Sequence, residues 1–172
     1  MSFIIYSGCV YVTSINACRA QNARAIHEQL IKHLQATRKM FTSAPILFMC
    51  ESNMGQEASH IYAMLNDVPG ITCLSDGKGR DGLLTTNDRK ESYVLELQRY
   101  LMTDTMFFCR DIEREGMQML KKEMMQFRRI VVDNPRARAK FYYTGKDRGQ
   151  DDTVMAVSMG FWWAMQHIRG LL

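Results

Sequence analysis

Three acidic residues stand beside stretches of sequence that look buried. Asp151 and Asp152 are adjacent and directly precede residues 153–163, which are almost entirely apolar, and Glu51 directly follows the apolar run at residues 46–50. A charge placed next to a buried element is costly unless it has a partner. Carboxylate oxygens are the ligands that Mg²⁺ prefers, and one or two of them usually hold each ion. These three residues are therefore candidate catalytic carboxylates that bind divalent metal.

Each carboxylate also has an explanation that needs no metal. Asp is a preferred N-cap residue and is favoured at the positive end of the helix dipole, so one Asp of the pair is explained as a cap. A second, adjacent Asp adds repulsion between like charges, which a divalent cation relieves. The pair is therefore explained by one Asp that caps the helix and one that binds a metal ion. For Glu51 the alternative is a salt bridge to an arginine.

Positive charge is concentrated just before the Asp pair. The chain has 22 Lys and Arg residues against 18 Asp and Glu residues, a net charge of +4. Residues 128–148 contain seven basic and two acidic side chains, so the rest of the chain is close to neutral. Such a cluster is either a solvated surface or the footprint of a polyanion such as nucleic acid. We favour the polyanion. The candidate contacts in this window include Arg136, Arg138 and Lys140.

Lys90 is a further basic candidate outside this window. It lies in the segment TTNDRK, residues 85–90. Its simplest interpretation is a solvated helix residue, and contact with a substrate phosphate is the alternative.

The predicted elements alternate between strands and helices. Strands are expected at residues 2–12, 46–50, 71–74, 83–86, 105–108 and 141–145, and helices at 17–41, 55–67, 88–102, 112–129 and from 153 onward. Continuous apolar runs such as residues 46–50 are typical of strands buried on both faces. The pattern predicts an α/β fold with a largely buried central sheet, in one domain over residues 1–172.

Cysteine usage and the N-terminal residues bear on the compartment. The five cysteines are scattered singly with no CxxC pair, which favours free thiols in a reducing intracellular compartment. The apolar N-terminal residues 1–12 lack a basic region and are too short to span a bilayer, so we expect no membrane partner.

Four motifs in order resemble the C-terminal nuclease domain of viral large terminase subunits, most closely the herpesvirus-type branch. They are CESN at 50–53, TTNDRK at 85–90, KEMMQFRR at 122–129 and FYYTGKDRGQDDTVMAVSM at 141–159. The resemblance covers about residues 3–168, and the acidic pair before an apolar helix is its most specific part. It implies an RNase H-like fold, with a central mixed sheet flanked by helices. It also implies cutting of concatemeric viral DNA during genome packaging, with two Mg²⁺ or Mn²⁺ ions.

The resemblance assigns roles to individual residues. Glu51 matches the second acidic motif, and Asp152, four residues before Ala156, matches the third; Asp151 would be a second ligand or a cap. Lys146 and Arg148, on the turn before the final helix, would approach DNA phosphates. The implied partners are double-stranded DNA, other terminase subunits and the capsid portal, and the implied location is the host cell nucleus.

One feature of the family has no counterpart here. Its first metal ligand is an Asp on the opening strand of the sheet, whereas no acidic residue precedes Glu28 in this chain, and Glu28 lies in a predicted helix. The sequence has no phosphate-binding loop, so we expect no ATPase domain in these residues. We therefore expect the sheet to lack its first strands, leaving apolar edges exposed, and the catalytic set to be incomplete as it stands.

Three functions follow from these patterns. The first is a two-metal DNA endonuclease, for which we expect weak sequence preference and steep salt dependence. The second is a non-catalytic DNA-binding or assembly module of a packaging motor. The third is another RNase H-like nuclease, of the resolvase or integrase type.

Overall fold

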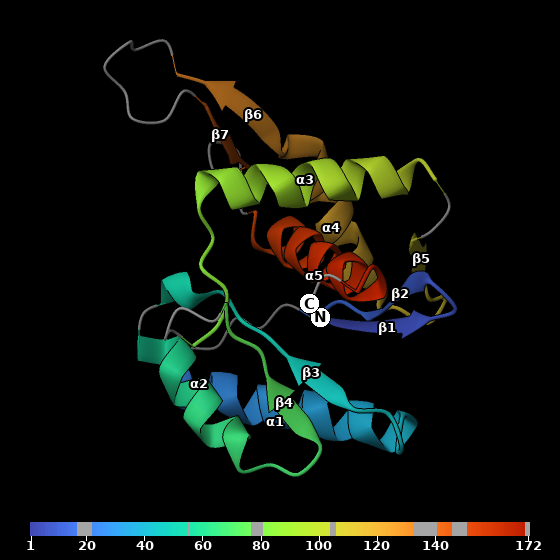
Figure 1. Ribbon diagram of the computed structural model, residues 1–172, viewed down its shortest axis with the longest axis vertical. Helices are drawn as coiled ribbons and strands as arrows, with labels where there is room; N and C mark the ends of the chain where they lie inside the picture. The colour runs from blue at the N-terminus through green and yellow to red at the C-terminus, as the bar shows by residue number, and fades with distance from the viewer. Residues whose placement is uncertain are drawn as a thin grey trace. The chain divides into compact units, whose positions relative to one another are not determined.

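The computed structural model divides the chain into two compact units (Figure 1). It describes residues 1–16, 22–54, 56–76, 81–103, 106–132, 141–145 and 151–170. The larger unit is formed by Met1–Ala17 and Thr86–Leu172, and the smaller unit by Cys18–Thr85. Each unit mixes helices and strands, so the predicted α/β class is confirmed. A single domain over residues 1–172 stays a prediction.

The larger unit contains a three-stranded mixed sheet. Its order is β1 (Ser2–Tyr6), β2 (Cys9–Ser14) and β5 (Met106–Phe108), with β1 antiparallel and β5 parallel to β2. The sequence predicted one strand over residues 2–12, and this prediction is wrong because the chain turns at Ser7 and Gly8. Both residues have positive φ, 51° and 75°, as the tightest hairpin turns require.

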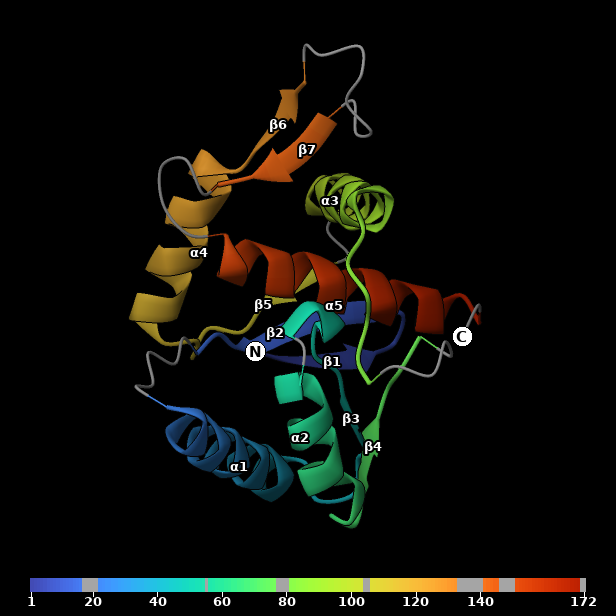
Figure 2. The same ribbon diagram turned by 90° about the vertical axis from the view of Figure 1, so that its left-hand side faces the viewer.

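The described residues of the larger unit also form three helices. They are α3 (Asn87–Leu101), α4 (Arg114–Gln126) and α5 (Asp152–Ile168). Helix α5 lies between the sheet and α3 (Figure 2). Its side chains Val157 and Phe161 are fully buried in one cluster with Val10 and Val12 of β2. Because α5 is covered on several sides, its sequence is apolar almost all round.

A second hairpin, β6 (Arg128–Val131) with β7 (Phe141–Thr144), also belongs to the larger unit. The sequence predicted helix through residue 129, whereas α4 ends at Gln126. Pairing with β7 explains the difference: Phe127 stacks on Tyr143 with ring centroids 6.0 Å apart, and the Arg129 guanidinium lies 4.0 Å from the centroid of the Phe141 ring. These contacts join residues distant in sequence, so helical spacing could not reveal them.

The smaller unit packs two helices beside a two-stranded parallel sheet. Its elements are α1 (Ala23–Met40), β3 (Ile46–Phe48), a 3₁₀ turn (Ser52–Met54), α2 (Gln56–Asn66) and β4 (Ile71–Cys73). Leu34, Ile61 and Leu65 form its buried core. The strand predicted at residues 83–86 is reduced to one bridge, between Leu83 and Glu51.

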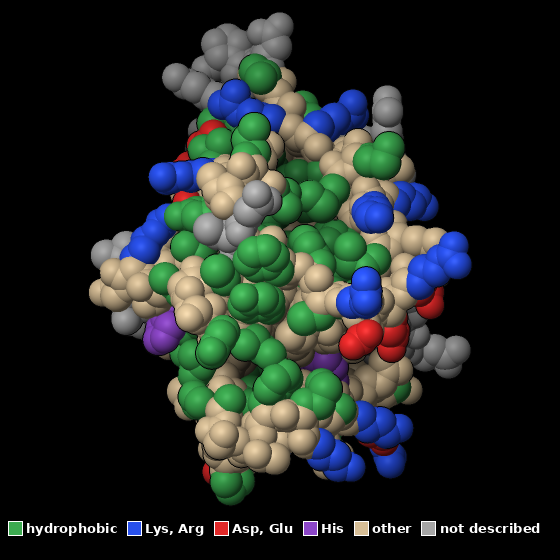
Figure 3. Space-filling model, turned by 90° about the vertical axis from the view of Figure 1, so that its right-hand side faces the viewer, with side chains coloured by type: hydrophobic (Ala, Val, Ile, Leu, Met, Phe, Trp, Pro, Cys, Tyr) green, Lys and Arg blue, Asp and Glu red, His purple; other side chains and the backbone are tan. Residues whose placement is uncertain are grey.

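The strands of the described residues therefore form three small sheets. Large hydrophobic side chains are exposed on the outer strands of the β1–β2–β5 sheet, among them Tyr6 and Phe107, and hydrophobic side chains cover much of the face shown in Figure 3. Within the described parts of the chain, no helix is long and apolar enough to cross a lipid bilayer.

Candidate functional site

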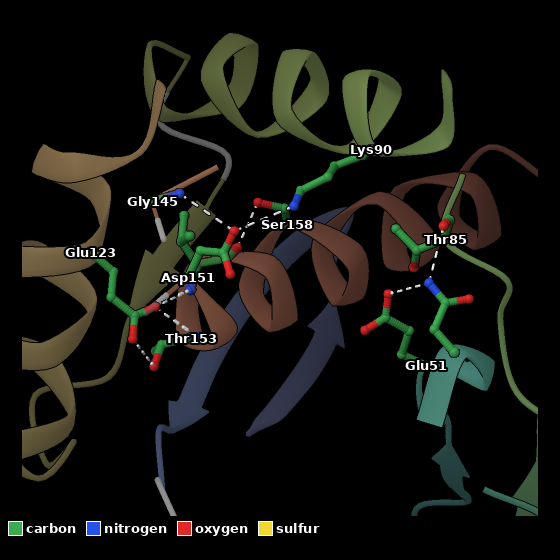
Figure 4. Close-up of polar contacts among 10 residues, drawn as sticks. Glu51, Thr85, Lys90, Glu123, Gly145, Asp151, Thr153 and Ser158 are labelled. Carbon is green, nitrogen blue, oxygen red and sulfur yellow. Dashed lines mark hydrogen bonds and ion pairs between the residues drawn. The ribbon is translucent and has the colours of Figure 1, made fainter. Parts of the chain in front are cut away.

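Glu51 lies just beyond the end of β3, at a partly exposed position of the smaller unit. Its Oε1 accepts a hydrogen bond of 3.0 Å from Asn53 Nδ2, which also donates to the backbone oxygen of Thr85 at 3.1 Å (Figure 4). The salt bridge to an arginine that the sequence left open is not present among the described residues. One amide therefore orients the Glu51 carboxylate, and no cationic side chain within the described part of the chain neutralises its charge.

The backbone on either side of Glu51 is held by the segment that begins at Gly82. Leu83 N–H donates to the Cys50 carbonyl at 2.9 Å, and Ser52 N–H donates to the Leu83 carbonyl at 3.0 Å. Gly82 has φ of +84°, and a Cβ there would lie 2.6 Å from the Cys50 oxygen. Gly82 therefore allows this segment to lie against the end of β3, which no local sequence pattern predicted.

Two buried hydroxyls flank this arrangement. Ser52 Oγ and Thr85 Oγ1 are buried and have no hydrogen-bond partner in the described structure. Buried polar groups nearly always find a partner, which can be a protein group, an ordered water or an ion. The surroundings of Glu51 are thus more polar, and less internally satisfied, than the rest of the core of the smaller unit.

Cys50 precedes Glu51 but is not an activated nucleophile. Burial raises the pKa of its thiol to about 11, from an ordinary value of 9.0, because the apolar surroundings disfavour the thiolate. The pKa of the neighbouring Tyr62 hydroxyl is also raised by burial, and this hydroxyl donates to the Leu74 carbonyl. Both groups are neutral at physiological pH.

In the larger unit, Asp151 is buried and faces Lys90. Only 3% of its surface is exposed to solvent, and its Oδ2 lies 3.4 Å from both Lys90 Nζ and Gly145 N (Figure 4). Lys90 also lies over the Phe127 ring, and its side chain is 18% exposed. The interpretation of Lys90 as a solvated residue is therefore wrong: its ammonium serves as the counter-charge of Asp151.

The N-terminus of α5 is capped by a residue that the sequence did not single out. Glu123 on α4 is 5% exposed, and its Oε2 accepts hydrogen bonds from Thr153 N at 2.7 Å and Val154 N at 2.9 Å. Its Oε1 accepts from Thr153 Oγ1 at 3.0 Å. Asp151 occupies the N-cap position but makes no capping hydrogen bond with its side chain. The expected cap is thus correct in position and wrong in its contacts.

Asp152 differs from its neighbour. It is the first residue of α5 and is exposed, and its carboxylate forms no hydrogen bond or ion pair within the part of the chain that the structure describes. Asp151 is therefore buried and paired, whereas Asp152 is exposed and has no partner within the residues that the structure describes.

The predicted site residues fall in different parts of the chain. Asp151 and Lys90 are brought together in the larger unit with Glu123, whereas Glu51 belongs to the smaller unit. Five candidate phosphate contacts lie outside the described residues, namely Lys146, Arg148, Arg136, Arg138 and Lys140.

The carboxylate oxygens of Glu51, Asp151 and Asp152 are ligands of the kind that hard cations prefer. Among the described residues, no group of three or more His, Cys, Asp or Glu side chains is placed so that it could hold a metal ion. Mg²⁺ or Mn²⁺ binding stays a prediction that rests on oxygen ligands in pairs or singly. Comparisons with protein families, with curated proteins and with solved structures give no match to this chain.

Proposed function

We propose that this chain is an RNase H-like, metal-dependent DNA endonuclease domain that cuts concatemeric viral double-stranded DNA during genome packaging. The observation that carries the proposal is that Asp151 and Asp152, although adjacent, have different environments. Asp152 presents a carboxylate without a partner among the described residues at the start of a buried helix, beside an aspartate that is buried and faces Lys90. A carboxylate on a helix terminus whose oxygens have no partner among the described residues can offer them to a hard cation.

Glu51 supports the same proposal. It follows a strand of a parallel pair, where ligands of α/β proteins collect. Asn53 holds one oxygen of the carboxylate, and the other oxygen has no partner among the residues described. Both Glu51 and Asp152 therefore keep oxygen atoms available for a hard cation.

The chemistry follows from these carboxylates. Divalent ions bound there would supply an activated water and charge stabilisation at the scissile phosphate. Glu51 and Asp152 would be ligands of these ions. The basic side chains within residues 128–148 would bind the phosphate backbone of the duplex without reading its sequence. Residues 1–27 contain no acidic side chain, so the first aspartate of the terminase type would have to come from elsewhere. Other terminase subunits and the capsid portal as partners, and the host nucleus as location, belong to the same proposal.

Cleavage of supercoiled plasmid with Mn²⁺ tests the proposal, comparing the parent with Glu51→Ala and Asp152→Ala. A metal ion contributes several kcal/mol at the transition state and each 1.36 kcal/mol is tenfold in rate, so we expect losses of about 100-fold or more. Asp88→Ala is the matched control, because Asp88 is an exposed acid in the first turn of α3.

Two results decide against the endonuclease. Cleavage that survives both alanine substitutions contradicts the metal site. A parent that binds DNA in a salt-dependent manner, but neither cleaves it nor binds Mn²⁺, favours the non-catalytic packaging module instead. A parent that binds Mn²⁺ through Asp152 without cleaving DNA points to the missing first aspartate, and extending the chain upstream is then the next measurement.

A further inference from the structure

The start of α5 departs from ordinary helix capping. An N-cap Asp normally accepts a hydrogen bond from the N–H of the second or third helical residue. For a helix that begins at Asp152 with Asp151 as its cap, these residues are Thr153 and Val154. Both of their N–H groups donate to Glu123 instead (Figure 4). Glu123 thus occupies the donors that the Asp151 side chain would otherwise take.

Among the described residues, the Asp151 carboxylate is only weakly satisfied where it lies. Its contacts to Lys90 Nζ and Gly145 N are both 3.4 Å long, beyond the usual range of 2.7 to 3.2 Å for such bonds. Glu123, in contrast, makes three contacts of 2.7 to 3.0 Å. Glu123 therefore caps the helix with short hydrogen bonds, whereas the Asp151 carboxylate makes only long contacts.

We propose that Glu123 is a positioning residue. By capping α5 from α4, it keeps the Asp151 carboxylate off the helix end and on the Lys90 side, from where it would serve as a second ligand beside Asp152 in the proposed metal site. The part of this inference that concerns metal rests on the proposed endonuclease function. The part that concerns the position of Asp151 does not.

A crystal structure of Glu123→Ala tests the position of Asp151 directly. Without the Glu123 carboxylate, two buried N–H groups lose their acceptor, which is costly. We expect the Asp151 side chain to rotate onto Thr153 N or Val154 N and to leave Lys90. Glu123→Gln keeps an acceptor oxygen of the same reach, so Asp151 is expected to stay on Lys90. If Glu123→Ala does not fold, Glu123→Asp withdraws the carboxylate by one methylene and gives the same test.

The concentration of Mn²⁺ that gives half-maximal cleavage tests the metal part. Loss of a residue that orients a ligand costs about 10- to 100-fold in metal affinity, so we expect a rise of about tenfold or more in Glu123→Ala. Glu123→Gln should remain near the parent. Glu115→Ala, an exposed acid in the first turn of α4, is the matched control and should not change it. A purely structural role of Glu123 would lower the urea midpoint without moving the Mn²⁺ requirement.

The outcomes separate the two proposals. The positioning role is overturned if the Asp151 side chain stays on Lys90 in Glu123→Ala. It is also overturned if Asp151 moves in Glu123→Gln as it does in Glu123→Ala. If the parent binds no Mn²⁺ while Asp151 rotates as expected, the proposed function fails and Glu123 still determines the position of Asp151.

Discussion

Gly82 is the residue at which a side chain would most directly disturb Glu51. Its φ of +84° is strained for any other residue by about 1–2 kcal/mol. A Cβ would also lie 2.6 Å from the Cys50 oxygen and 3.2 Å from Ser52 N, both backbone atoms that hydrogen-bond to Leu83. We expect Gly82→Ala to lower the free energy of unfolding by more than the strain alone, measured by urea titration with far-UV circular dichroism.

Gly8→Ala isolates the strain from the collision. Gly8 has a similar φ of +75°, but no atom lies within 4 Å of the position that its Cβ would take. We expect this variant to show only the backbone strain. Equal losses in the two variants would show that the close approach of Gly82 to the residues around Glu51 is unimportant.

At the scale of elements, two helical glycines mark where helices approach their neighbours. A Cβ at Gly116 of α4 would lie 2.2 Å from the Ile15 carbonyl oxygen, and one at Gly160 of α5 would lie 2.4 Å from the Phe3 ring. Ala is about 1 kcal/mol better than Gly inside a helix, so both substitutions would stabilise isolated helices. We expect Gly116→Ala to be clearly destabilising and Gly160→Ala less so, because a side-chain ring moves more easily than backbone.

Thermal unfolding of both variants measures this order. Phe3→Leu combined with Gly160→Ala should recover part of any loss, because the smaller side chain leaves room for the new methyl group. Gly160→Ala proving more harmful than Gly116→Ala would contradict the assignment of the tighter contact to α4.

The helices could be predicted from the sequence because their signal is local. The ranges expected for α2 and α3 lie within about one residue of those observed, since apolar residues recur at helical spacing. Strand β6 and the Glu123 cap could not be predicted in this way. The first depends on pairing with β7 and the second on a contact between α4 and α5 over 30 residues, and neither leaves a periodic pattern. The residue types of Asp151 and Asp152 made them candidate ligands. Their different burial depends on contacts between elements distant in sequence, which the local sequence does not encode.

At the scale of the whole molecule, the two units differ in the core that supports them. The larger unit buries twelve hydrophobic residues in one cluster, and the smaller unit buries Leu34, Ile61 and Leu65 in its own. Small cores bury too little apolar surface to be strongly stable. We expect the smaller unit to unfold at a lower urea concentration than the larger one. Both tryptophans, Trp162 and Trp163, lie on α5, so their fluorescence reports the larger unit, whereas far-UV circular dichroism reports both.

Two core substitutions assign the transitions. Leu65 and Val157 are both fully buried, in α2 and α5, and truncating a buried aliphatic side chain to Ala costs about 1–5 kcal/mol. Leu65→Ala should shift the early circular dichroism transition and leave the tryptophan transition in place, while Val157→Ala should shift the tryptophan transition. If either substitution moves both probes together, the chain unfolds as one cooperative domain, as its sequence predicts.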